Sequence, residues 1–167
     1  IELRMTNFND DILSSIRNFK GVQDAEGRRV INYRVHPEGS TQWSTIDLIA
    51  VEDFSKNNVN LLVPILGKAE AGKDEIVLNK KNMDKVHATV GDYLVFELAD
   101  GTTKKLKVVG VVQDSSTGAD DFLAPPFAFT VMDTLQTLQQ PDLFNRAYLT
   151  VSDSPNDLTH IRTLGAD

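Results

Sequence analysis

The segment VGDYLVFELADGTTKKLKVVGVVQD, residues 90–114, contains two apolar-rich stretches joined by the tripeptide ADG. Asp-Gly between two such stretches is a strong short-range signal for a β-hairpin. A two-residue loop would pair Leu94 with Lys107. A three-residue loop, with Gly101 in the left-handed conformation of a bulge, would instead pair Leu94 with Leu106.

Burial favours the three-residue loop, because it gathers the apolar side chains of both strands on one face. A slip of one residue would turn side chains to the opposite face of the sheet. The side chains expected on the shared buried face are Leu94, Phe96, Leu98, Leu106 and Val108.

Both ends of the chain have the pattern of a strand followed by a helix. Residues 1–6 are a strand candidate, Asn9 is the expected N-cap of the first helix, and Gly21 is its expected stop. Residues 147–151 form a second strand candidate, and Ser154 precedes a proline at the first position of a second helix. The pattern predicts one α/β lobe built from both termini. In the first helix, Phe8 and Leu13 occupy the positions of a hydrophobic staple, and Ile12, Ile16 and Phe19 form one face at helical spacing.

The middle of the chain is rich in strand signals. Residues 29–35 alternate between apolar and polar, and residues 43–54 are apolar on both faces, which indicates a strand interior to a sheet. Residues 76–78 and 127–131 are further strands, and a short helix that Pro141 ends follows the latter.

These elements predict an α+β protein with two lobes. A βαβ-containing lobe is expected from residues 1–63 plus 142–167, which come from both ends of the chain. Residues 64–141 are expected to form an inserted, β-rich lobe.

Charge and composition exclude several classes of partner. The chain has 17 basic and 24 acidic residues, a net charge of −7, and no cysteine. Binding to nucleic acid requires a basic face, so the net negative charge argues against a nucleic-acid partner. The sequence also has no polybasic patch that would bind anionic lipid. The absence of cysteine excludes disulfides and thiolate metal sites.

The sequence contains no recognisable catalytic or cofactor motif. His36, His87 and His160 are scattered, without a second ligand at metal spacing. The loop GKAEAGKD places Asp74 where a phosphate-binding loop needs Ser or Thr. We therefore expect no catalytic residues, no cofactor, no metal and no enzymatic activity. An enzyme whose site is assembled from distant residues is the disfavoured alternative.

One apolar segment is a candidate for contact with a partner. This segment, residues 122–127, follows a polar stretch that begins with Ser-Ser-Thr-Gly at residues 115–118. Aromatic side chains often contribute a large share of the binding energy of an interface. The alternative is that the segment packs onto its own core before the next strand. The candidate contact residues are Phe122, Leu123, Pro125, Pro126 and Phe127.

The order of these pieces resembles a known family of membrane-protein domains. The segments FKGVQDA (19–25), EIVLN (75–79), the hairpin from VGD (90–92) to LKVVGVVQD (106–114), and FTVMDTLQ (129–136) are similar to the extracytoplasmic core domain of MacB/FtsX/LolC-type ABC transporter permeases. The resemblance covers most of the chain. It consists of fold patterns rather than chemical motifs.

The resemblance implies a non-enzymatic domain outside the cytoplasmic membrane, between two transmembrane helices of a permease. It implies a cytoplasmic ATPase subunit whose cycle the domain couples to an extracytoplasmic partner protein or cargo, and it is compatible with a dimer in the full transporter. The process that the parent transporter serves remains open among export, lipoprotein release and cell-envelope regulation. The alternative is a free-standing secreted binding or adhesion module.

Overall fold

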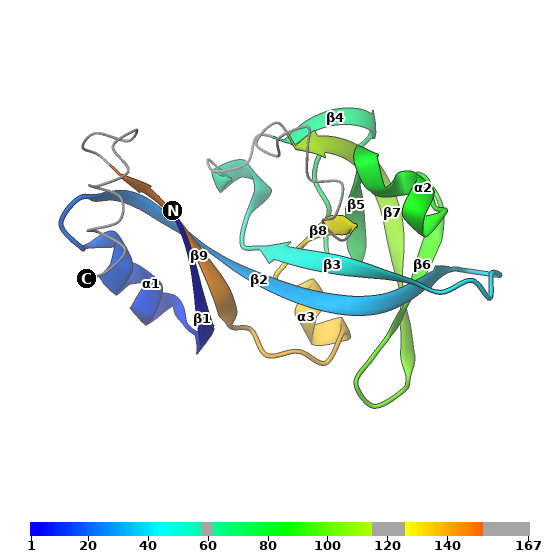
Figure 1. Cartoon of the computed structure of the whole chain (residues 1–167), viewed down its shortest axis with the longest axis horizontal. Helices are drawn as coiled ribbons and strands as arrows, with labels where there is room; N and C mark the ends of the chain where they lie inside the picture. Colours follow the sequence, from blue (N-terminus) through cyan, green and yellow to red (C-terminus); the bar gives the residue numbers. More distant parts are fainter. Residues whose placement is uncertain (58–61, 115–125, 152–167) are drawn as a thin grey trace. The chain divides into compact units, whose positions relative to one another are not determined.

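The computed structural model describes residues 1–57, 62–114 and 126–151 (Figure 1). The described residues have the predicted α+β composition, with long strands and short helices. They form two compact units: a terminal unit of residues 1–29 and 143–151, and a central unit made from the described part of residues 30–142. No helix in the described ranges is long and apolar enough to cross a membrane.

The terminal unit joins the two ends of the chain in one sheet, as predicted. Its strands are β1 (Glu2–Phe8), the first part of β2 (Val22–Pro37) and β9 (Phe144–Val151). β9 lies between β1 and β2 and is antiparallel to both.

Helix α1 (Asp10–Arg17) begins where the sequence predicted. The Ile12 amide donates to Asn9 Oδ1 (3.3 Å), and Phe8 and Leu13 are both buried, as expected of a hydrophobic staple. On the apolar face at helical spacing, Ile12 and Phe19 are exposed, and the buried residue of the helix is Leu13 of the staple. The helix ends at Arg17, so Phe19 no longer belongs to it.

The central unit contains most of the regular structure. Its strands are the second part of β2, β3 (Ser44–Val51), β4 (Leu62–Gly67), β5 (Glu75–Asn79), β6 (Tyr93–Glu97), β7 (Thr103–Asp114) and β8 (Phe127–Val131). Its helical segments are η1 (Phe54–Lys56), η2 (Lys80–Asn82), α2 (Met83–Val86) and α3 (Thr134–Thr137).

The strands of the central unit close into a ring. Hydrogen-bonded neighbours follow the order β2–β3–β8–β5–β7, and the short strand β6 pairs with both β7 and β2 (Figure 1). Ring closure removes the exposed edges that an open sheet would present. One apolar cluster includes side chains from all of these strands, among them Val35, Ile46, Leu78, Phe96, Leu106 and Ala128.

This ring explains where the units differ from the predicted lobes. Residues 30–57, expected in the terminal lobe, cluster with the central unit. The physical reason is that β3 pairs in parallel with β8 and the end of β2 pairs with β6, so both strands complete the ring. β1 and β9 belong to the terminal unit, and the described part of residues 64–141 belongs to the central unit.

The hairpin register chosen from the sequence is confirmed. Leu94 pairs with Leu106, and Gly101 has a φ of +82°. The Gly101 amide donates to the Leu98 carbonyl (3.0 Å), and the Leu98 amide donates to the Thr102 carbonyl (2.8 Å), which closes a three-residue loop. All five side chains of the predicted face are buried: Leu94, Phe96, Leu98, Leu106 and Val108.

Gly110 of β7 is required by the close approach of another backbone segment. A Cβ atom at this position would lie 1.7 Å from the carbonyl oxygen of Lys68. The residue is buried, and it pairs with Gly67 across the β4–β7 ladder. A side chain here would therefore force the two strands apart.

The substitution Gly110→Ala should destabilise the chain by about 3 kcal/mol or more, because the backbone in contact cannot move aside as a flexible side chain can. Gly101→Ala is the matched control, since its Cβ meets no atom within 4 Å and adds only left-handed backbone strain. It should cost roughly 1–2 kcal/mol. Urea denaturation of both variants measures this, and equal losses would contradict the steric argument.

The hairpin turn should depend on pH through Asp100. The hydroxyl and the amide of Thr102 donate to its carboxylate and lower the pKa of Asp100 below its ordinary value. Because the pKa of Asp100 is lower in the folded chain than in the unfolded chain, the ionised carboxylate and its hydrogen bonds stabilise the fold. This stabilisation is fully present above the unfolded-state pKa and is lost as pH falls through the folded-state pKa. Asp100→Asn should lower the thermal midpoint at neutral pH, and this difference should shrink as pH falls below the ordinary aspartate pKa of about 3.9. A difference that grows on acidification would contradict the assignment.

Candidate interaction surfaces

The predicted contact segment lies partly outside the described residues. Phe122, Leu123 and Pro125 lie outside the described residues, and their role in a partner contact stays a prediction. Pro126 and Phe127 are described and are partly buried. The Pro126 carbonyl accepts from the Asp47 amide (2.7 Å), so backbone pairing to β3 fixes the end of the segment.

Phe127 packs on a second apolar cluster of the central unit. The cluster is built from buried residues of β3, β5, β7 and β8, including Val51, Val77 and Phe129. The rings of Phe127 and Phe129 meet edge to face, with centroids 5.6 Å apart. Phe127 therefore packs partly on the core, and its role in a partner contact stays a prediction.

Strand β4 carries an exposed apolar surface that the sequence analysis missed. Val63, Ile65 and Leu66 are 43%, 45% and 50% exposed, and Pro64 between them is exposed too. We call these four consecutive residues the β4 strip. The preceding residue of the strand, Leu62, packs on the same cluster as Phe127. The start of β4 and Phe127 thus adjoin one apolar cluster.

The β4 strip offers side chains rather than backbone to a partner. Among the described strands, β4 pairs only with β7 and so forms an edge. Pro64 has no amide hydrogen, and the register shift between Pro64 and Leu66 leaves Ile65 as an extra, bulged residue. A proline and a bulge both discourage a foreign strand from adding to an edge. Exposed apolar side chains on such a strand fit a contact made by packing.

A sequence signal for this strand existed. The run LLVPIL, residues 61–66, is a continuous apolar stretch, and proline within a strand pattern indicates an edge. Exposure of the run could not be inferred, because a continuous apolar stretch is also typical of a buried strand.

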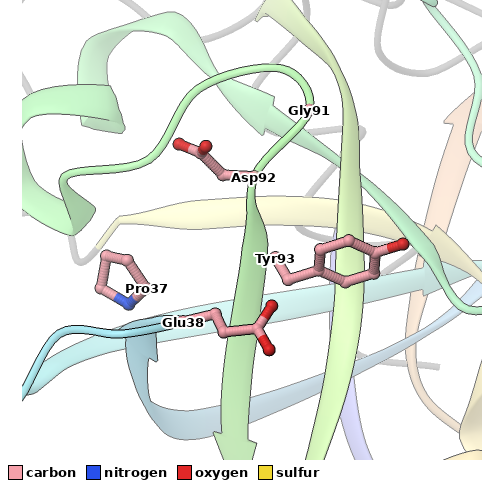
Figure 2. Close-up of a pocket in the computed structure, with 5 residues that line it drawn as sticks. All are labelled: Pro37, Glu38, Gly91, Asp92 and Tyr93. Atoms are coloured by element: carbon pink, nitrogen blue, oxygen red, sulfur yellow. The ribbon is translucent and has the colours of Figure 1, made fainter.

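A separate shallow pocket lies at the start of β6 (Figure 2). Its volume is about 330 Å³, and Pro37, Glu38, Gly91, Asp92 and Tyr93 line it. Glu38 accepts a hydrogen bond from Lys105 Nζ (2.7 Å), which raises the pKa of Lys105. The Asp92 carboxylate accepts from the Thr89 amide (2.9 Å). Both carboxylates are therefore already engaged by the protein itself.

The pocket has no arrangement suited to catalysis. It contains no nucleophile paired with a base. Across residues 1–57, 62–114 and 126–151, no three His, Asp or Glu side chains gather at metal-binding distance. His36 contacts the ring of Trp43, with centroids 4.5 Å apart, and its Nδ1 lies 2.8 Å from the Pro37 carbonyl oxygen. His87 is exposed, and His160 lies outside the described residues.

Two substitutions distinguish the core-facing part of this region from the exposed part. Phe127→Ala should cost roughly 2 kcal/mol of unfolding free energy, below the roughly 3–5 kcal/mol typical of a fully buried phenylalanine. Ile65→Ser should change it by less than about 0.5 kcal/mol, as surface substitutions do. Denaturant titration measures both values. A large loss for Ile65→Ser would show that the β4 strip is covered.

Comparison with known proteins gives structural matches only. No family model matches the chain, and no curated protein matches it in sequence. The extracellular domain of the noncanonic ABC-type transporter YknZ from Gram-positive bacteria superposes with a TM-score of 0.65 at 12% identity, covering 98% of this chain and 87% of that one.

Two further structures agree. The periplasmic region of MacB from Actinobacillus actinomycetemcomitans gives a TM-score of 0.58 at 12% identity, covering 98% of this chain and 78% of that one. A domain assigned to a permease protein from Porphyromonas gingivalis gives 0.56 at 10% identity, covering 81% and 59%. The fold expected from the sequence is thus confirmed: the chain has the fold of the extracellular and periplasmic domains of MacB-type ABC transporter permeases.

Proposed function

We propose that this chain is a non-enzymatic extracytoplasmic domain of an ABC transporter permease. The observation that carries the proposal is the likeness to the YknZ extracellular domain over 98% of this chain. In the parent protein, the partners would be its own transmembrane helices and a cytoplasmic ATPase. The domain would couple the ATPase cycle to a partner protein or cargo outside the membrane.

The proposal assigns the contact with that partner or cargo to side chains, not to a catalytic centre. Leu62, which precedes the β4 strip, and Phe127 pack on one apolar cluster, and the β4 strip itself is exposed. Contiguous exposed apolar side chains commonly mark a protein contact. Because Pro64 and the bulge at Ile65 discourage strand addition, the partner would pack against this surface without extending the sheet.

The location of the domain can be tested with single cysteines, because the chain has none of its own. Lys104 is exposed in the hairpin, and Val111 is fully buried in the same strand. In intact cells carrying the full-length parent protein, a membrane-impermeant maleimide should label Lys104→Cys. Val111→Cys should be labelled only after denaturation.

Labelling of Lys104→Cys only after cell lysis would place the domain in the cytoplasm and contradict the proposal. Recovery of the protein from the medium, with no membrane-bound form, would favour the free-standing secreted module. In a reconstituted transporter, Ile65→Asp should reduce transport while its thermal midpoint stays near that of the wild type.

A further inference from the structure

The outer edge of β1 is built to pair with a second strand. The amino group of Ile1 donates to the Leu149 carbonyl (2.9 Å), and the Leu149 amide donates to the Ile1 carbonyl (2.8 Å). Backbone groups of alternate residues point to the same edge of a strand. The backbone N–H and C=O groups of Leu3 therefore also point to β9. The backbone groups of Glu2 and Arg4 point to the opposite edge of β1. Among the described strands, β1 pairs with β9 alone.

The charges on the terminal sheet are sorted into two rows. Arg4 is opposite Arg146, which is opposite Arg28 on β2. The neighbouring row runs from Glu2 through Tyr148 to Glu26. Like charges directly opposite one another destabilise a sheet.

Ion pairs between the rows offset part of this cost. Glu2 Oε1 lies 2.9 Å from Arg4 Nε and 3.4 Å from Arg146 Nε, and Glu26 lies 3.3 Å from Arg28. The outermost member of the basic row is the most accessible, because the Arg4 side chain is 73% exposed. It lies on β1, which is an edge strand among the described residues.

We propose that β1 pairs antiparallel with β1 of a second copy of this chain, about a two-fold axis at Leu3. Glu2 then lies opposite Arg4 of the partner subunit, and the two residues exchange backbone hydrogen bonds through groups that already face outward. The basic row of one copy then continues into the acidic row of the partner subunit, and the acidic row continues into the partner's basic row. Pairing about Arg4 would instead place arginine opposite arginine, so charge selects the axis at Leu3.

The association should be weak. Each copy carries a net charge of −7, which opposes dimerisation, although charges beyond about 8 Å are screened at physiological ionic strength. A single strand pairing buries far less than the roughly 1,200 Å² of a stable interface. Dimers should therefore appear as the concentration rises toward about 1 mM, the range of weak complexes. This inference does not depend on the proposed transport function.

Charge reversal tests the pairing in analytical ultracentrifugation. Arg4→Glu places carboxylates opposite each other at both symmetric positions and should weaken dimerisation at least about tenfold, the equivalent of 1.4 kcal/mol. The swap Glu2→Arg with Arg4→Glu restores opposite charges and should bring the dissociation constant back to within about threefold of wild type. It also places a carboxylate opposite Arg146, where the wild type has Arg4. A wild-type chain that stays monomeric at about 1 mM overturns the proposal, as does a swap that fails to rescue.

Cysteine cross-linking tests the register without altering charge. In the proposed pairing, Leu3 faces Leu3 of the partner subunit as a non-hydrogen-bonded pair, with Cα atoms about 4.5 Å apart, within the range of about 4.4–6.8 Å that disulfides span. Leu3→Cys should therefore form an intermolecular disulfide under mild oxidation. Met5→Cys, two residues along the same strand, is the matched control and should cross-link much more slowly. Equal rates for the two variants would overturn the register.

Discussion

Closure of the strand ring through β6 is the constraint on which the central unit depends. β6 has only the residues Tyr93–Glu97, yet it must pair with β2 on one side and β7 on the other. The double pairing leaves neither backbone edge of β6 open, and Leu94, Val95 and Phe96 are all buried. It also fixes the hairpin register, because a slip of one residue would turn Leu94 and Phe96 out of the cluster that the ring encloses.

The sequence could predict features that depend on neighbours along the chain. The hairpin register followed from Gly101 and from the spacing of apolar residues, and the helix start followed from Asn9. It could not predict that residues 30–57 join the central unit, since this depends on the parallel pairing of β3 with β8, about eighty residues later in the chain. The exposure of Ile12 and Phe19 was equally invisible, because helical periodicity marks a face without showing what covers it.

The candidate interaction surfaces, too, could be predicted from the sequence only in part. Phe127 was found from its place beside a polar run, and its partial burial needed the positions of β3, β5 and β7. The β4 strip was present in the sequence as an apolar run, but only the pairing of β4 with β7 shows that the strand is at an edge. On a fold without a metal cluster in its described residues, such exposed apolar side chains are the features best suited to recognition.

The pairing of β1 with β9 also determines the order in which the chain can fold during synthesis. Glu2 pairs with Tyr148, so nearly the whole chain must be made before the terminal sheet can form. The last ring strand of the central unit, β8, ends at Val131. At about 5–20 residues per second, β1 therefore waits several seconds for its partner while the ring assembles. Ribosome-bound chains ending before β9 should accordingly contain a folded ring while β1 still lacks its partner strand.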